Sequence, residues 1–300
     1  VAWGKNGYLA KVTSFSMRGV TFGVGMSLAQ SKSHINFTMI IFHLTDWSGS
    51  DVAEDIFPGL IDIQTTVRES FGWDYQSDLL SAKLLAESLN NEIPFSVNSW
   101  SPINRRITLE RLKEKLLGVP KVVIVGASVC EEDFVDFDFE NSVVIAADGS
   151  IGGVIELAEI ACVVTDFDGN PHLDDAVNAG AIFIAHAHGD NITNWQNCLG
   201  KWQALERPPG LILTHQVTES IDGMYNFGGF TDGDRAVCLA IGLGVPKENI
   251  SLIGFSTTKI GKWSGQTNPT RKLDKLAWML RVLQIIGLED QVDSNDFEVP

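Results

Sequence analysis

The sequence has few cysteines and few basic residues, and both shortages exclude classes of protein. Cysteine occurs four times in 300 residues, and no CxxC pair is present. Cysteines this far apart favour buried, reduced thiols over a disulfide framework or a zinc knuckle. Lysine and arginine number 22 against 38 aspartates and glutamates, which gives a formal net charge of −16. Because such a chain repels nucleic-acid phosphates and anionic membranes, we expect neither as a partner.

Long apolar runs are also missing. The stretch from Phe37 to Leu44 is apolar, but it is far shorter than the roughly 20 residues that a membrane-spanning helix needs, and no small-residue cleavage site follows it. Together with the reduced thiols, these features predict a cytoplasmic protein. A homo-oligomer is compatible with the composition, and the acidity by itself indicates solubility or a salt-adapted cytosol.

The chain divides by composition into four segments. Residues 1–50 are rich in serine, glycine and aromatic residues without clean periodicity, and begin at Val1 rather than methionine, as a fragment boundary or a misplaced start would explain. Residues 51–119 have apolar positions at helical spacing, which predicts a small helical region. We expect an α/β catalytic domain over residues 120–288 and an acidic tail over residues 289–300.

Six short apolar runs, bounded by glycine or aspartate, mark the α/β segment. Continuous apolar runs of this length are typical of strands that are covered on both faces by helices. The predicted strands are residues 121–125, 142–147, 161–164, 181–185, 211–213 and 250–255. Helical patterns separate them, so the sequence predicts a three-layer α/β sandwich with a mostly parallel six-stranded sheet, preceded by the small helical region.

Carboxylates follow two neighbouring predicted strands. Asp148 comes directly after one strand, and Asp166 and Asp168 follow the next. In a parallel sheet such residues meet beyond the carboxyl ends of the strands, where ligands bind. Grouped carboxylates suit Mg²⁺, which takes a few protein oxygens together with substrate phosphates. The alternative is that the D-x-D-G stretch is only a turn.

A histidine-rich stretch follows the fourth predicted strand. His186 and His188 alternate, so on a strand both would face the same way, and Asp190 and Asn191 come just after them. The pair could contact phosphate oxygens or, with Asp190, bind zinc. Two histidines satisfied by loop backbone are an equally good interpretation.

The stretch from Asn226 to Arg235 is the most specific part of the sequence. Two adjacent glycines precede a helix, a combination that lets backbone N–H groups approach an anion, and Arg235 could clamp a phosphate. The aspartates and threonine here could instead cap the helix, and the two phenylalanines could stack a flat ring or join the core. The candidate ligand-binding residues of this loop are Gly228, Gly229, Thr231 and Asp232.

Two further stretches are weaker phosphate candidates. Gly126 and Ser128 follow the first predicted strand, where a tight turn is an equally good interpretation. Lys259 and Lys262 lie in a glycine-containing turn after the sixth strand, where solvated side chains are equally expected.

Taken in order, these motifs resemble those of the archaeal 6-hydroxymethyl-7,8-dihydropterin pyrophosphokinases. The resemblance covers roughly residues 57–286 and rests on five motifs: Ala-Asp148-Gly, Thr-Asp166-Phe-Asp168-Gly, His186-Ala-His188-Gly-Asp190-Asn191, Asn226-Phe-Gly-Gly-Phe-Thr-Asp232-Gly-Asp234-Arg235 and Ile260-Gly-Lys262. The first two also resemble, more faintly, the metal-binding acids of thiamin pyrophosphokinases. The chain departs from the pattern at Ala127, where a Gly-Pro-Ser-type turn is usual, and at Ser256, where an acid is expected.

The resemblance implies Mg²⁺-dependent transfer of a diphosphoryl group from ATP to the hydroxymethyl oxygen of a reduced pterin, for folate or methanopterin synthesis. Asp166 and Asp168 would be the principal metal ligands, supported by Asp148 and Asp190, while His186, His188 and Arg235 would steady phosphate oxygens. Positioning would provide most of the rate enhancement, without a strong general base. The rival hypotheses are a thiamin pyrophosphokinase-like enzyme, a glycosyltransferase-like enzyme and a non-catalytic nucleotide-binding module.

Overall fold

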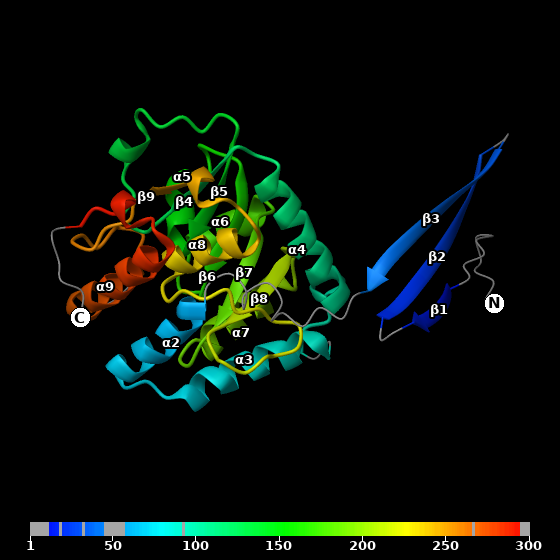
Figure 1. Cartoon of the computed structure of the whole chain (residues 1–300), viewed down its shortest axis with the longest axis horizontal. Helices are drawn as coiled ribbons and strands as arrows, with labels where there is room; N and C mark the ends of the chain where they lie inside the picture. Colours follow the sequence, from blue (N-terminus) through cyan, green and yellow to red (C-terminus); the bar gives the residue numbers. More distant parts are fainter. Residues whose placement is uncertain are drawn as a thin grey trace. The chain divides into compact units, whose positions relative to one another are not determined.

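The computed structural model describes residues 12–17, 20–31, 34–44, 58–91, 94–265 and 268–294, in two units that comprise residues 1–48 and 49–300. The first unit contains an antiparallel sheet in the order β1-β2-β3 (Figure 1). Its strands are β1 (Val12–Met17), β2 (Val20–Ser31) and β3 (His34–Leu44). The sequence predicts no helix or strand in residues 1–50, because their polar and apolar residues do not alternate cleanly.

The described part of the helical region in the second unit contains the helices α2 (Pro58–Phe71), α3 (Tyr75–Asn90) and α4 (Pro102–Leu117). Residues 51–57 of the predicted helical region lie outside the described residues. The sequence predicts a helix over residues 79–89 with a cap at Ser77-Asp78, but α3 begins earlier. The side chain of Asp74 accepts hydrogen bonds from the backbone N–H groups of Gln76 and Ser77. Ser101 caps α4, with Pro102 in its first turn.

A six-stranded parallel sheet forms the centre of the second unit, in the order β8-β7-β6-β5-β4-β9. Its strands are β4 (Lys121–Val125), β5 (Ser142–Ala147), β6 (Ile160–Thr165), β7 (Ile182–Ala187), β8 (Leu211–His215) and β9 (Ile250–Ile253). The predicted fold class is confirmed, and all five strand pairings are parallel. Every residue of β5 is buried, as the continuous apolar run requires.

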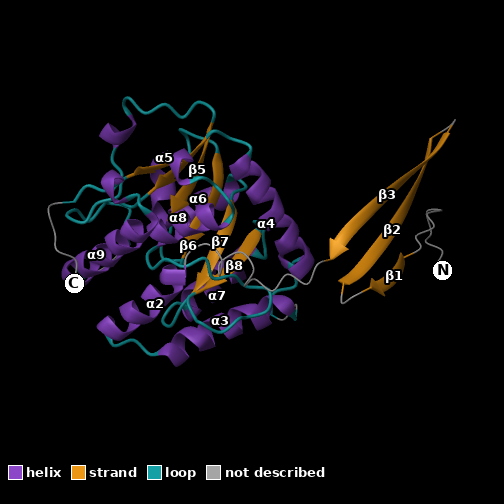
Figure 2. Ribbon diagram, viewed as in Figure 1, coloured by secondary structure: helices purple, strands orange, loops and turns teal. Residues whose placement is uncertain are grey.

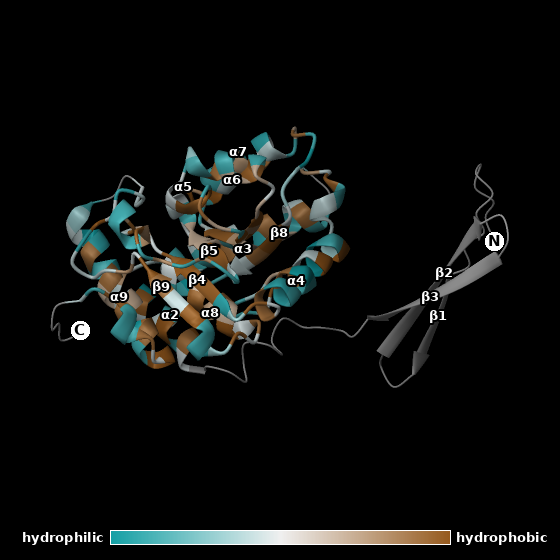
Figure 3. Ribbon diagram, turned by 90° about the horizontal axis from the view of Figure 1, so that it is seen from above, coloured by the Kyte–Doolittle hydropathy of each residue, from teal (hydrophilic) through white to brown (hydrophobic). Residues whose placement is uncertain are grey.

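Helices cover both faces of this sheet, which makes the predicted three layers (Figures 2 and 3). On one side lie α5 (Ile151–Val154), α6 (His172–Asn178) and α7 (Ile192–Trp202), and on the other α4, α8 (Asp232–Gly242) and α9 (Pro269–Ile286). Trp195 and Trp202 of α7 join one continuous apolar core with Val163 and Phe183 of the sheet. Short 3₁₀ turns complete the unit: Asn98–Trp100, Glu131–Phe134, Asp148–Ser150, Lys247–Asn249 and Glu289–Gln291.

The cysteines are free thiols, as predicted, but one of them is not buried. Cys162, Cys198 and Cys238 lie in the core, whereas Cys130 is exposed in the turn after β4. Its apolar neighbours in sequence suggested burial, but the turn leads into an acidic surface segment instead. Within the described ranges, no helix has both the length and the apolar character to cross a bilayer.

Candidate active site

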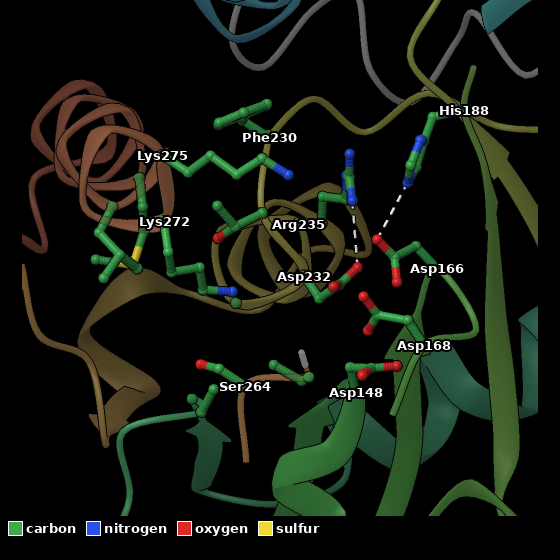
Figure 4. A pocket seen from close by; sticks show the side chains of 18 of the residues that line it. Asp148, Asp166, Asp168, His188, Phe230, Asp232, Arg235, Ser264, Lys272 and Lys275 are labelled. Carbon is green, nitrogen blue, oxygen red and sulfur yellow. Dashed lines mark hydrogen bonds and ion pairs between the residues drawn. The ribbon is translucent and has the colours of Figure 1, made fainter. Parts of the chain in front are cut away.

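A cavity of about 590 Å³ lies beyond the carboxyl ends of the central strands (Figure 4). Its lining comes from the turns after β4, β5, β6 and β7, from the loop that leads into α8, and from α9. This is the edge of the sheet at which the sequence predicts ligand binding.

The floor of the cavity carries the three carboxylates that the sequence singled out. Asp148 follows β5, and Asp166 and Asp168 follow β6, so the pairing of β5 with β6 brings them together. One oxygen from each lies within 4.8 Å of the other two. Thr165 fixes the turn, because its hydroxyl donates to Asp148 Oδ1 and accepts from the backbone N–H of Phe167 at 2.7 Å.

The crowding of these groups favours a cation. Burial and the charges of neighbouring carboxylates, Asp166 first among them, raise the pKa of Asp148 well above its usual value and raise the pKa of Asp168 as well. Asp166 Oδ1 is buried and has no hydrogen-bond partner among the described residues. A divalent cation would relieve the repulsion and satisfy this oxygen, so the three carboxylates fit Mg²⁺.

His188 lies between two carboxylates at the edge of this cluster. Its Nε2 is 3.1 Å from Asp166 Oδ2 and its Nδ1 is 2.9 Å from Asp190 Oδ1. Burial opposes protonation, but these hydrogen bonds outweigh it and raise the pKa of His188 to about 9. The pKa of Asp166 is lowered in turn, because its hydrogen bond to His188 outweighs burial. Since carboxylates occupy both ring nitrogens, His188 is unsuited to the zinc alternative.

His186 and Asn191 lie behind the cavity wall rather than in its lining. His186 is buried, with Nδ1 3.0 Å from Thr214 Oγ1, and burial keeps its pKa well below the usual value. Asn191 Nδ2 donates to the backbone oxygens of Asp166 and His186, and its Oδ1 accepts from the backbone N–H of His188. Its amide therefore shapes the turn that presents Asp166 and His188.

The loop before α8 separates into residues that face the cavity and residues that do not. Thr231, Asp232 and Arg235 line it, whereas Gly228 and Gly229 do not. Gly229 has φ 83°, and a Cβ there would lie 2.8 Å from Arg235 Cα, so this glycine allows the loop to pack closely on α8.

Asp232 and Arg235 form an ion pair inside the cavity. Arg235 Nη1 lies 3.2 Å from Asp232 Oδ1. Burial and the nearby Asp166 charge raise the pKa of Asp232 to about 7, even though Arg235 opposes the shift. The neighbouring Asp234 accepts from the backbone N–H groups of Phe230 and Thr231 and so caps α8, as the sequence allowed.

A basic wall, formed by Arg271, Lys272 and Lys275 of α9, faces the acidic floor. Lys275 Nζ lies 5.4 Å from the ring centroid of Trp73, and Arg271 Cζ lies 5.3 Å from the same ring. The sequence predicts for this helix only an apolar stripe, at Leu273, Leu276, Ala277, Leu280 and Leu283. Three cations in the first two turns, where the helix dipole disfavours positive charge, were the signal that could have identified them.

Of the remaining predicted phosphate ligands, two line the cavity and two lie outside it. Gly126 and Ser128, in the turn after β4, line the cavity. Lys259 Nζ instead pairs with Asp293 Oδ2 at 2.9 Å, and Lys262 is exposed with its Nζ 4.5 Å from the Trp263 ring centroid. Neither lysine lines the cavity.

No family model matches the chain. Three curated archaeal proteins do, and all three are named 6-hydroxymethyl-7,8-dihydropterin pyrophosphokinase. The chain resembles these archaeal pyrophosphokinases. The protein from Pyrococcus furiosus is 39% identical over 160 residues, which cover 51% of this chain and 64% of the relative. The protein from Methanothermobacter thermautotrophicus is 32% identical over 48% of this chain and 62% of its own length.

The third relative, from Methanocaldococcus jannaschii, is 29% identical over 58% of this chain and 69% of the relative. The predicted resemblance to archaeal pterin pyrophosphokinases is thus confirmed. In each of the first two relatives the match spans slightly less than two thirds of the protein.

Both departures from the pyrophosphokinase pattern lie at the cavity. Ala127 and Ser256 line it. Ser256 Oγ accepts hydrogen bonds from the backbone N–H groups of Thr258 and Lys259, at 3.1 Å each, so it closes the turn after β9. Ser256 therefore stabilises this turn at the position where the pyrophosphokinase pattern has an acidic residue.

Proposed function

We propose that this chain is an ATP-dependent diphosphotransferase that acts on 6-hydroxymethyl-7,8-dihydropterin. The hydroxymethyl oxygen attacks the β-phosphorus of ATP, and the bond between the β-phosphorus and the α,β-bridging oxygen breaks. The products are AMP and the pterin diphosphate, and the hydroxyl proton is released. The product would serve folate or methanopterin synthesis in the cytoplasm.

One observation carries the proposal: a single cavity places three carboxylates opposite four cationic side chains, in a chain that resembles named pterin pyrophosphokinases. A polyphosphate needs cationic partners, yet the floor of the cavity is acidic. A ligand that arrives with a divalent cation, as magnesium–ATP does, is compatible with both the acidic floor and the basic wall.

The acidic floor would hold Mg²⁺ through Asp148, Asp166 and Asp168. When bound, the ion neutralises phosphate oxygens and helps to align donor and acceptor. His188, positively charged at neutral pH, steadies Asp166 and is itself oriented by Asp190. The pairing keeps Asp166 ionised over the working pH range.

Arg235 and the basic wall of α9 would together hold the phosphate chain. Arg235 presents a planar guanidinium at the start of α8, and Lys272 and Lys275 approach from α9. The backbone of the turn at Gly126 and Ser128 and the hydroxyl of Thr231 would add neutral contacts. The chain's contribution to rate is then mainly the positioning of the two substrates.

The direct test is incubation with ATP, Mg²⁺ and 6-hydroxymethyl-7,8-dihydropterin, followed by chromatography and ³¹P NMR. We expect AMP and pterin diphosphate in equal amounts, and no AMP when the pterin is omitted. Thiamin is the matched alternative acceptor. Turnover of thiamin alone would assign the chain to the thiamin pyrophosphokinase-like alternative, turnover of a nucleotide sugar to the glycosyltransferase-like one, and Mg-ATP binding without AMP to a non-catalytic module.

A further inference from the structure

Gln216 lies directly after β8, between the cavity and the helical region. Its side chain is buried, and its Oε1 accepts a hydrogen bond from Arg235 Nη2 at 2.8 Å. Its Nε2 donates to Asp78 Oδ2 at 2.9 Å. Gln216 belongs to no motif of the sequence, and Asp78 stands there only as a possible helix cap.

The chemistry of the two partners determines which way this amide points. A guanidinium can only donate hydrogen bonds, and an ionised carboxylate can only accept them. The amide oxygen must therefore face Arg235 and the amide nitrogen must face Asp78. Inverting the amide would place donor against donor and acceptor against acceptor, so the side chain has a single satisfied orientation.

Asp78 is the centre of a buried network. Its Oδ2 also accepts from Arg68 Nε at 3.0 Å, and its Oδ1 accepts from the backbone N–H of Gly189 at 2.8 Å. Arg68 in addition donates to the backbone oxygen of Gln216 at 2.7 Å. Helices α2 and α3 are thereby connected both to Arg235 and to the turn that carries His188.

Arg235 depends on this network for its position. Its side chain is 8% exposed and, among the described residues, it hydrogen-bonds to Asp232 and Gln216, while its buried Nε has no hydrogen-bond partner there. Without Gln216, the ion pair with Asp232 alone would hold the guanidinium, and the remaining N–H groups would lose their fixed direction toward the cavity.

We infer that Gln216, anchored by Asp78, is a positioning residue that aims Arg235 at the phosphates of the bound nucleotide. The inference rests on the proposed function only in taking Arg235 as a phosphate ligand. It gives the helical region a part in nucleotide binding, although α2 and α3 contribute few groups to the cavity itself.

The test is a double-mutant cycle read out by calorimetric titration with Mg-ATP. We expect Gln216→Met to weaken Mg-ATP binding by roughly tenfold, because a disordered guanidinium loses a charge-assisted hydrogen bond. In an Arg235→Met background, we expect the same substitution to add less than roughly twofold, since residues that act as a unit are not additive. Circular dichroism checks that each variant folds.

Gln64→Met is the matched control. Gln64 is also a buried glutamine, but it bonds to Asn226 and to the backbone of Gly229, neither of which lines the cavity. We expect it to lower stability while it leaves the Mg-ATP affinity within about twofold of wild type. If Gln216→Met fails to fold, Gln216→Asn replaces it, because this amide is one methylene too short to reach both partners.

Equal losses of affinity from Gln216→Met in the two backgrounds would assign Gln216 a general structural role and overturn the inference. An equal loss from Gln64→Met would do the same. A wild-type protein that binds Mg-ATP but forms no pterin diphosphate would overturn the proposed function alone, since the binding cycle still decides the inference.

Discussion

At the scale of single residues, hydrogen bonding separates three carboxylates that sequence spacing makes equivalent. Asp166 pairs with His188, which lowers its pKa, whereas the pKa of Asp148 and that of Asp168 are raised by burial and by the Asp166 charge. Asp166 is therefore the most readily ionised of the three without a cation, and a bound metal ion would favour the ionised form of the other two.

Asp168→Asn tests the metal site with little disturbance of the fold, because the amide keeps the shape of the carboxylate and removes its charge. We expect AMP formation to fall by roughly a hundredfold or more, since one ligand of a cation that stabilises transferring phosphates is lost. The thermal midpoint should change little. The control is Asp136→Asn, an exposed carboxylate outside the cavity. Retained activity in Asp168→Asn would remove Asp168 from the mechanism.

His215 predicts a pH dependence of stability that is independent of the acidic floor. Burial lowers its pKa to about 4, so the folded state resists protonation while the unfolded chain accepts a proton near pH 6.5. The stabilising contribution is complete above the unfolded pKa and is lost as pH falls from about 6.5 toward 4.

The variant His215→Asn keeps an acceptor for the backbone N–H of Val217 but cannot titrate. Relative to wild type, we expect this variant to gain about 2 kcal/mol of unfolding free energy between pH 7 and pH 5. Urea unfolding at both pH values measures the difference, in which titrations shared by the two proteins cancel. An unchanged difference would show that the His215 pKa is not lowered by folding.

At the scale of elements, α9 has two different faces. Leu276, Leu280 and Leu283 of the predicted apolar stripe are buried, whereas Leu273 of that stripe is exposed. The preceding turns carry cations toward the cavity, where Arg271 and Lys275 both lie against the ring of Trp73 in the segment after α2. The helix is thus both a cover for the sheet and one wall of the site.

Lys275→Met measures the contribution of this wall. We expect Mg-ATP affinity to fall by roughly tenfold at low salt, with a smaller loss at high salt, because the partly buried ammonium acts as a point charge. Lys83→Met, on the exposed side of α3, is the matched control. The sequence offers Lys262 as a phosphate ligand, whereas the structure places Lys275 in the cavity lining. We therefore expect Lys262→Met to weaken Mg-ATP binding less than Lys275→Met does. A larger effect from Lys262→Met would contradict the assignment to α9.

At the scale of the whole molecule, the charge of the site links ligand binding to stability. Four aspartates meet at the cavity, and the repulsion among them opposes folding. We expect Mg²⁺ to raise the thermal midpoint by several degrees, since a ligand at about 100 times its Kd adds about 2.7 kcal/mol. Scanning calorimetry with Mg²⁺ and then with excess chelator measures this shift. The shift should be absent in Asp168→Asn, and its persistence there would place the ion elsewhere.

The parallel sheet and the place of the acidic floor could be predicted from the sequence alone. Short apolar runs that end in Gly or Asp are typical of strands covered on both faces, and parallel strands carry their carboxyl ends to one edge. Asp148, Asp166 and Asp168 could therefore be brought together by reasoning from order along the chain alone.

Which other polar groups share that edge depends on how distant elements of the chain pack together. His186 and His188 alternate on one stretch, yet β7 continues through His186 and buries it, while His188 emerges into the cavity. Gln216 and Lys275 lie far from the acidic motifs in sequence and meet them only through packing of β8 and α9. Such contacts depend on the directions in which whole elements cross, and local periodicity carries no information about those directions.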